Sequence, residues 1–192
     1  MATSIPSNRT GDVCDDDLME FTLETGRAIL SRTPDTLRAL LGDLPEEWTM
    51  SDEGPDTWSP YQVMGHLVHI EEVDWMDRTL VILAQDELRT FDPVDREAGF
   101  SRFAGWTMIE LLDRFEAVRS TNLAKLDSVV TVNDLDLGAV HPTFGDVTLR
   151  ELLATWVVHD FNHLGQIVKT MSKQYRDAIG PWRAFLPIVD AE

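Results

Sequence analysis

Apolar residues recur every three or four positions along most of this chain, which is the period of a helix with one buried face. Four stretches carry this pattern over the length of a helix, and they begin near residues 15, 60, 107 and 148. Three of these starts pair Ser or Thr with Gln or Glu three residues later, which is the capping box of a helix N-terminus. The pairs are Ser59 with Gln62, Thr107 with Glu110, and Thr148 with Glu151. The pattern predicts an all-α four-helix bundle, with short extra helices or strands in the connections.

The first half of the chain is predicted to supply two of the four long helical stretches. The first begins at Asp15, and Pro34 either kinks it or starts a second short helix, because proline is favoured in a first helical turn. Residues 42–56 contain proline and glycine breakers, so we expect a loop there. The second long helix is expected to run from the Ser59 cap to about Ala84.

The second half is predicted to supply the other two helices. An irregular connection over residues 86–105 leads to the third helix, and the fourth ends near Gln174. Residues 129–147 between them are a connection that could hold short strands. Trp182 and Phe185 in the C-terminal segment are expected to pack back onto the bundle, since large aromatic side chains usually bury their area.

Length and charge narrow the class of protein. The chain has 192 residues, 43% of them hydrophobic, which suits one globular domain. We expect residues 1–14 to be a flexible tail and residues 15–192 to be that domain. The net charge is -18, from 34 acidic and 16 basic residues, so the chain repels phosphate backbones and nucleic-acid binding is not expected.

Membrane insertion and disulfide bonding are also not expected. No apolar run approaches the roughly 18 residues of a membrane span, and the polar N-terminus lacks the order of a signal peptide. We therefore expect a cytoplasmic protein. Cys14 is the single cysteine, which excludes an internal disulfide, and its acidic neighbours make it a poor nucleophile.

Two histidines stand out in the last helix. His159 and His163 are four residues apart, so their side chains lie one above the other on one helix face. Leu152, Trp156 and Ile167 continue the same stripe, which places both imidazoles on the buried side. A shared metal ion would explain two stacked buried imidazoles, and the simpler alternative is that they are core residues with ordinary hydrogen bonds.

A third imidazole can come from the second helix. His66 follows Val63 by three residues and precedes Ile70 by four, so it shares the inward stripe. Three neutral imidazoles with a fourth position open are typical of a catalytic zinc site. His69, three residues further on, is the rival ligand from the same helix.

Catalytic residues beyond the ligands are not identified by pattern alone. Glu71 could be a general base or orient a ligand, although an ion pair with an arginine is the simpler interpretation. Asp74 lies on the inward stripe and could join the site. Asp160 and Asn162 flank the ligands and could orient an imidazole by a hydrogen bond, but both turn away from the metal face, so we expect them to be solvated. His141 precedes a proline in a loop, where it is either exposed or at the rim of a pocket.

Three stretches, in this order, resemble the DinB-like (DinB/YfiT) superfamily. They are residues 58–67 (WSPYQVMGHL) with Glu71 after them, residues 141–153 (HPTFGDVTLRELL), and the closing His159-x-x-x-His163-x-Gly165-Gln166. The resemblance spans roughly residues 15–175. It implies a four-helix bundle, commonly a homodimer, with a metal site of three histidines. Those positions correspond to His66, His159 and His163, while Leu164 stands where the family usually has arginine.

The resemblance also implies a class of activity. Characterised relatives include metal-dependent transferases and isomerases that use a low-molecular-weight thiol such as glutathione, mycothiol or bacillithiol. We therefore expect a small-molecule substrate and a divalent metal, with zinc or nickel ahead of iron. The expected function is a thiol S-transferase or a related hydrolase. The alternatives are a non-catalytic metal-binding stress-response or sensor module, and a metal-free bundle used for association.

Overall fold

The computed structural model describes residues 19–191, so the predicted tail at residues 1–14, with Cys14, lies outside the described part of the chain. The elements follow in the order α1 (Leu23–Leu30), α2 (Thr33–Leu41), α3 (Glu46–Met50), α4 (Pro60–Val73), α5 (Trp75–Ala84), α6 (Ala98–Arg102), α7 (Met108–Val129), η2 (Val132–Asp134), β1 (Gly138–His141), β2 (Gly145–Thr148), α8 (Leu149–Lys173), η3 (Gly180–Phe185) and η4 (Pro187–Val189). Across residues 19–191, no helix combines the length and apolarity that a bilayer span needs.

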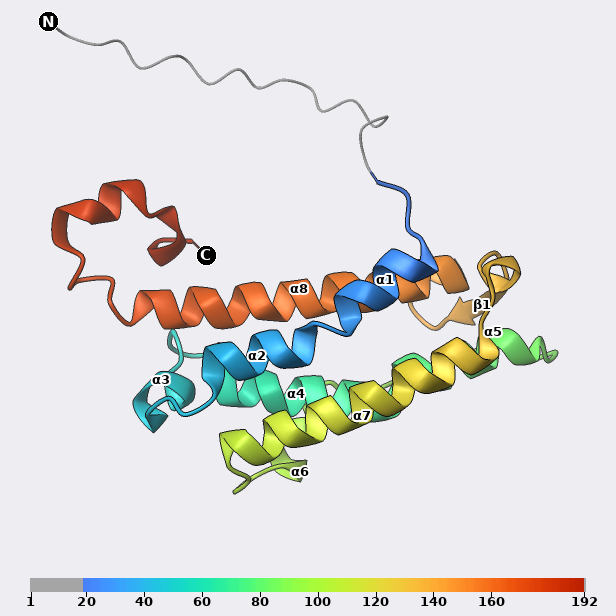
Figure 1. The fold of residues 1–192 in the computed structure, drawn as a ribbon, viewed down its shortest axis with the longest axis horizontal. Coiled ribbons are helices and arrows are strands. Elements are labelled where there is room, and N and C mark those ends of the chain that lie inside the picture. Colours follow the sequence, from blue (N-terminus) through green and yellow to red (C-terminus); the bar gives the residue numbers. More distant parts are fainter. Residues whose placement is uncertain (1–18, 192) are drawn as a thin grey trace, which may run out of the picture.

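Four helical arms lie along the long axis of the molecule (Figure 1). The first arm is α1 followed by α2, the second is α4 followed by α5, and α7 and α8 are the third and fourth. α4 packs against both α7 and α8, while α1 packs on α8 and α2 packs on α7. This arrangement confirms the predicted four-helix bundle, and α3 and α6 are short extra helices in its connections.

The predicted helix starts are present at atomic detail. The hydroxyls of Ser59, Thr107 and Thr148 each accept a hydrogen bond from the backbone amide three residues later. In return, the backbone amide of each cap residue donates to the side-chain oxygen of that Gln or Glu. Each box satisfies two donors that a helix start otherwise leaves unpaired. Pro34 lies in the first turn of α2, so the chain starts a new helix there and does not merely kink.

The start of the first arm differs from the prediction. The helix was expected to begin at Asp15, but α1 begins one residue after Thr22, and residues 19–22 are not helical. The Thr22 hydroxyl accepts a hydrogen bond from the backbone amide of Thr25 at 3.1 Å, so Thr22 is the N-cap residue at which helix α1 starts. The prediction was wrong over residues 19–22, and residues 15–18 lie outside the described part.

The second arm is divided at Asp74, whose φ of -120° and ψ of -68° leave the helical region. Its backbone amide still donates to the Ile70 carbonyl at 3.0 Å, and its carbonyl accepts the Arg78 amide at 2.9 Å. The continuous helix predicted to Ala84 was therefore wrong at one residue. The spacing of apolar residues could not reveal this break at Asp74, because the helical hydrogen bonds and the buried stripe of side chains both continue in α5.

The connection between α7 and α8 contains the short strands that the sequence allowed. β1 and β2 pair antiparallel, with His141 opposite Gly145 at the tip. Gly145 has a φ of 77°, a conformation that favours glycine. Thr90 bridges to Val140, and the Phe91 amide donates to the Val140 carbonyl at 3.2 Å. The segment after α5 is thereby fixed along the hairpin.

The C-terminal segment curls beyond the end of α8 (Figure 1). Trp182 and Phe185 were expected to pack onto the bundle, but they are 69% and 81% exposed. The segment is held instead by buried Val189 in η4, which contacts α8, and by the ion pair of Asp190 with Arg176 just beyond α8. The prediction was wrong because a small aliphatic side chain makes the contact and leaves the rings outside.

The core has two apolar clusters with a buried polar layer between them. On α7, Arg119 lies between Phe115 of one cluster and Leu123 of the other. On α8, Asp160 lies between Trp156 of one cluster and Ile167 of the other. Arg119 and Asp160 are each 1% exposed. Asp160 was predicted to be solvated, and this was wrong, because the position turned from the histidines faces another helix and not water.

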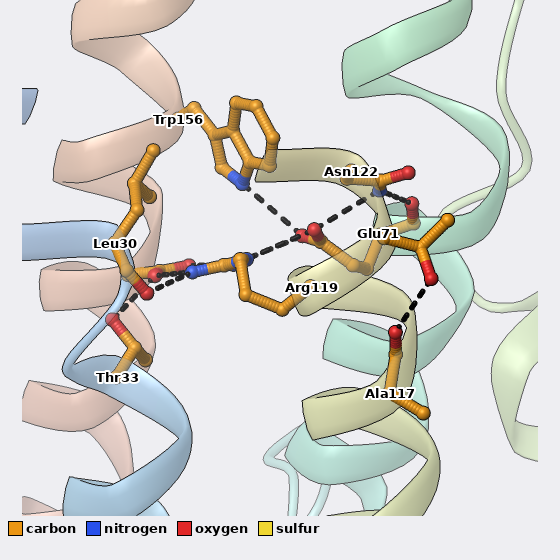
Figure 2. Close-up of polar contacts among 9 residues, drawn as sticks. Leu30, Thr33, Glu71, Ala117, Arg119, Asn122 and Trp156 are labelled. Atoms are coloured by element: carbon orange, nitrogen blue, oxygen red, sulfur yellow. Dashed lines mark hydrogen bonds and ion pairs between the residues drawn. The ribbon is translucent and has the colours of Figure 1, made fainter. Parts of the chain in front are cut away.

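Arg119 is the centre of the polar layer (Figure 2). Its guanidinium donates to Asp160 at 2.7 and 3.0 Å and to Glu71 at 2.9 Å through two nitrogens. It also donates to the backbone carbonyl of Leu30 at 3.0 Å. One side chain of α7 thereby joins α4, α8 and the end of α1. The ion pair that was the simpler interpretation of Glu71 is present.

Neighbouring groups satisfy the remaining carboxylate oxygens. The Thr33 hydroxyl donates to Asp160 at 2.7 Å, and the Trp156 indole N–H donates to Glu71 at 3.1 Å. The Asn122 amide donates to the backbone carbonyl of Glu71 at 2.7 Å and to its carboxylate at 3.1 Å. Burial raises the pKa of Glu71, and the Arg119 charge acts in the opposite direction. A buried charge group is tolerated when it is saturated in this way.

Removing the central cation should destabilise the fold strongly. In Arg119→Met, Glu71 and Asp160 would remain buried without their counter-charge, and we expect the free energy of unfolding to fall by about 3–5 kcal/mol. Equilibrium unfolding in urea measures the change. Arg27→Met is the matched control, because Arg27 pairs with Asp127 at the surface and the change there should be small. Equal effects of the two substitutions would contradict the central role of Arg119.

Candidate metal centre

The three histidines proposed from the sequence lie together inside the bundle. His159 and His163 are successive inward positions of α8, with ring centres 4.4 Å apart. His66 reaches them from α4, with ring centres 5.3 Å from His159 and 4.6 Å from His163. One nitrogen from each ring lies within 4.8 Å of the other two, and within residues 19–191 this is the group of side chains with metal-binding geometry.

Hydrogen bonds orient two of the rings. His66 Nδ1 lies 2.8 Å from the Arg96 carbonyl, and His163 Nδ1 lies 2.9 Å from the Gln166 side-chain oxygen. Both partners are acceptors, so each Nδ1 carries the proton and each Nε2 presents a lone pair. His66 Nε2 and His159 Nε2 are 3.2 Å apart. The arrangement fits a metal ion, because lone pairs converge in a buried place.

Burial keeps these imidazoles neutral. Desolvation lowers the pKa of His66 to about 4, against a smaller raising effect of the Arg96 carbonyl. Desolvation, followed by repulsion from His163 and His66, lowers the pKa of His159 to about 2. The pKa of His163 is also lowered by burial. At neutral pH all three rings are therefore in the uncharged form that binds metals.

Two tryptophans hold the rings in place. Trp58 stacks nearly parallel to His163, with ring centres 6.2 Å apart, and lies 5.0 Å from His66. Trp75 meets His159 edge-on at 5.1 Å. The cluster is therefore bounded by rigid aromatic walls, which limit the rotamers that the imidazoles can adopt.

The other candidate ligands from the sequence do not join the cluster. His69 points to a loop, where its Nε2 lies 3.0 Å from the Asp95 carbonyl. Asp74 pairs with Arg78 at 2.5 Å, and burial raises the pKa of its carboxyl group. Glu71 is committed to the Arg119 network. The group that could hold a metal in the described part of the chain thus contains three histidines and no fourth side chain.

A cavity of about 490 Å³ opens onto the histidine cluster. Apolar residues and charged, polar or histidine residues share its wall almost equally: Trp58, His66, Ile70, Asp74, Trp75, Arg78, Phe91, Pro93, Val94, Arg96, His141, Pro142, Thr143, Phe144, Val147, Glu151, Leu152, Thr155, His159, Asn162 and His163. His141 thus borders the pocket, one of the two places considered for it. Asn162 is exposed, as expected, and also borders the cavity.

Sequence reasoning missed two residues that orient the cluster. Gln166 lies three positions after His163 on α8, and this spacing could have identified it as a hydrogen-bond partner. Arg96 acts on His66 through its backbone carbonyl, and no side-chain pattern signals such a contact.

A helical bundle with three inward neutral histidines under a cavity defines a class of candidate metalloprotein. Comparison with known families is consistent with this class. The family model of the DinB superfamily matches residues 29–167, and the chain belongs to this superfamily. The match confirms the resemblance drawn from the three sequence stretches.

One solved structure has a similar fold along nearly the whole chain. It is YfiT from Bacillus subtilis, described as a probable metal-dependent hydrolase with an unusual four-helix bundle topology. The TM-score is 0.68 at 17% sequence identity, and the match covers 88% of this chain and 93% of that chain. At this identity the likeness establishes the fold alone. No curated protein shows significant sequence similarity to the chain.

The buried imidazoles should make the metal-free protein sensitive to acid. The pKa of His66 is about 4 when folded, against about 6.5 for an unfolded histidine, so the unfolded chain binds more protons between these values. The contribution of this ring to the free energy of unfolding is therefore fully present above about pH 6.5. It falls as pH decreases, by at most about 1.4 kcal/mol per pH unit. Urea unfolding from pH 7 to 4.5 should give a shallower decline for His66→Gln than for the wild type. Parallel declines would rule the effect out.

Proposed function

We propose that the protein is a metal-dependent enzyme whose divalent ion is held by His66, His159 and His163. The observation that carries the proposal is the convergence of three neutral imidazoles, two of them with Nδ1 held by an acceptor. No fourth side chain completes the group in residues 19–191, so a substrate or water has access from the cavity. Three imidazoles suit zinc or nickel, and iron less specifically.

The reaction class follows from what the cavity wall lacks. Among the residues that line the cavity there is no cysteine, serine or lysine. The wall does contain Thr143 and Thr155, but neither hydroxyl is hydrogen-bonded to a base within residues 19–191, so the described part of the wall offers no activated resident nucleophile. The nucleophile is therefore a small molecule, either a low-molecular-weight thiol or water. A divalent ion would supply the activation, because it lowers the pKa of a bound thiol or water and polarises an electrophile. This supports a thiol S-transferase or a related hydrolase.

The protein's own groups would position the reactants. Arg96 and Gln166 hold two ligand rings in the tautomer that metal binding requires. The aromatic side chains of Trp58 and Trp75 lie against the histidine rings and form part of the cavity wall, so they would limit how a reactant approaches the ligands. Asp74 and Glu71 are each neutralised by an arginine, so neither is placed to act as a general base.

The alternative is a non-catalytic metal-binding module for stress response or sensing. The same histidine cluster serves that function, and the pocket of about 490 Å³ is what favours an enzyme. In either case the small-molecule ligand and the metal would be encountered in the cytoplasm, where low-molecular-weight thiols are reduced.

The association state we propose is a homodimer. The outer face of α8 carries Val158, Phe161 and Val168, which are exposed at helical spacing. Gly165 lies in the same row, and nothing within 4 Å would meet a side chain added there. Such a row on a long helix suits packing against a second copy.

Metal content tests the site directly. Protein purified without a tag or chelators should contain about one equivalent of a transition metal, and His163→Ala should lose it because two imidazoles bind a divalent ion far more weakly. Elemental analysis gives the amount and the identity. His69→Gln is the matched control on α4, since His69 faces a loop, and it should retain the metal. Metal-free wild-type protein would overturn the proposal.

Activity separates the enzyme from the binding module. With a low-molecular-weight thiol and a model electrophile such as an alkyl halide, wild-type protein should give thioether above the uncatalysed rate, and His159→Ala should abolish the excess. Product formation is followed by mass spectrometry. Full metal loading without turnover of either thiol or hydrolysable ester substrates would favour the sensor module.

Charge on the outer face of α8 tests the dimer. In Phe161→Glu a carboxylate would replace a half-exposed ring at the centre of the row, and dimers should dissociate to monomers. Light scattering coupled to size-exclusion chromatography measures the mass. Phe144→Glu, at the exposed hairpin tip, is the control and should leave the mass unchanged.

A further inference from the structure

The charged groups of the cavity wall are unequally paired. Asp74 and Arg78 neutralise one another at 2.5 Å. The Glu151 carboxylate accepts the Thr148 amide at 2.7 Å and its hydroxyl at 2.9 Å, so it caps α8. The Arg96 guanidinium forms no ion pair or hydrogen bond with any group in residues 19–191. It is thus the charged side chain of this wall that still lacks a partner.

Arg96 is fixed to the histidine cluster by its own backbone. Its carbonyl accepts from His66 Nδ1 at 2.8 Å, while the next residue towards the N-terminus, Asp95, holds His69 in the same way at 3.0 Å. Its positive charge makes a minor contribution to lowering the pKa of His66 and His159. The same charge acts to lower the pKa of His141 and, against the larger raising effect of burial, that of the Asp74 carboxyl group, so the guanidinium lies near the wall that these residues form. The Arg96 side chain lines the cavity and is also exposed to solvent, so a ligand that enters the cavity from solvent can reach it.

A second unused donor lies on the same wall. His141 Nδ1 accepts the backbone amides of Thr143 at 3.1 Å and Phe144 at 3.3 Å, so the ring proton is on Nε2. The ring stacks on Phe144 with centres 4.5 Å apart and meets Phe91 edge-on at 6.0 Å. Burial and the charges of Arg78 and Arg96 lower the pKa of His141, so the neutral form is maintained. Its Nε2–H has no acceptor among the described residues.

The remaining residues of the wall determine what kind of ligand body the cavity can bind. Ile70, Trp75, Phe91, Val94 and Leu152 are apolar and lie on the cavity. The chain as a whole has a net charge of -18, so an anion approaching from solvent is repelled unless local cations receive it. An unpaired guanidinium at the edge of an apolar cavity is therefore a specific feature and not the sign of a generally basic surface.

We propose that Arg96 and His141 form an anion subsite, and that the ligand of this cavity carries an apolar body with a carboxylate at the end away from the histidine cluster. The inference deepens the proposed function, because it specifies the substrate or thiol that the cavity accepts. Arg96 supplies a charge-assisted pair and His141 one neutral N–H, which together match the two oxygens of a carboxylate.

The test compares two probes that share one body and differ in the end group, a charged carboxylate in one and a neutral amide in the other. 3-Phenylpropionate and 3-phenylpropanamide share an apolar body, and Trp58 and Trp75 in the wall report binding by fluorescence. The full-length chain is treated with chelator first, so that a carboxylate has no metal to bind, and circular dichroism verifies the fold. We expect the acid to bind about tenfold more tightly than the amide, as for one charge-assisted hydrogen bond in a partly exposed site.

Variants assign the preference to its residues. Arg96→Gln keeps the backbone carbonyl that orients His66, and it should bring the acid and the amide to equal affinity. His141→Phe should reduce the preference in part and keep the ring stacking. Arg102→Gln removes the same charge from a residue that pairs with Glu72 away from the cavity, so it should keep the tenfold ratio.

Equal binding of acid and amide by the wild type would overturn the anion subsite, and so would a full preference in Arg96→Gln. Because these measurements are made without metal, their failure is distinct from failure of the metal analysis, which bears on the proposed function.

Discussion

The fold depends on one buried arginine. Arg119 joins Glu71 on α4, Asp160 on α8 and the C-terminal carbonyl of α1, so a single guanidinium contacts three of the four arms from the remaining one. Such a network costs desolvation free energy and gains little net stability over apolar packing. Its effect is on register instead, because a shift of any arm by one residue would leave a charge buried without a partner.

That register places the histidine cluster. Asp160 lies between His159 and His163 along α8, and Glu71 follows His66 by five residues on α4. When Arg119 aligns the two carboxylates, the imidazoles on the adjacent faces of the same two helices are brought opposite one another. The Arg119 network and the histidine cluster lie on the same two helices but on different faces. The network therefore sets the geometry, while the histidines remain available for ligands.

The segment between α5 and α7 completes the site. It lies along the hairpin through the bridge of Thr90 to Val140 and passes over α4, where the carbonyls of Asp95 and Arg96 meet His69 and His66. The part of this connection before α6, which contains no helix, thereby fixes one ligand tautomer and forms part of the cavity wall. Functional residues are often carried by such loops on a rigid scaffold.

The sequence by itself determined what depends on neighbours along the chain. The capping boxes at Ser59, Thr107 and Thr148 placed three helix starts, and the four-residue spacing of His159 and His163 put both rings on one buried face, because these contacts lie within one or two helical turns. Only the tertiary structure decided that Asp160 is buried against Arg119, that the Arg96 carbonyl holds His66, and that Trp182 stays exposed. These outcomes join residues far apart in sequence, and a helical period indicates which face is buried without identifying the partner that covers it.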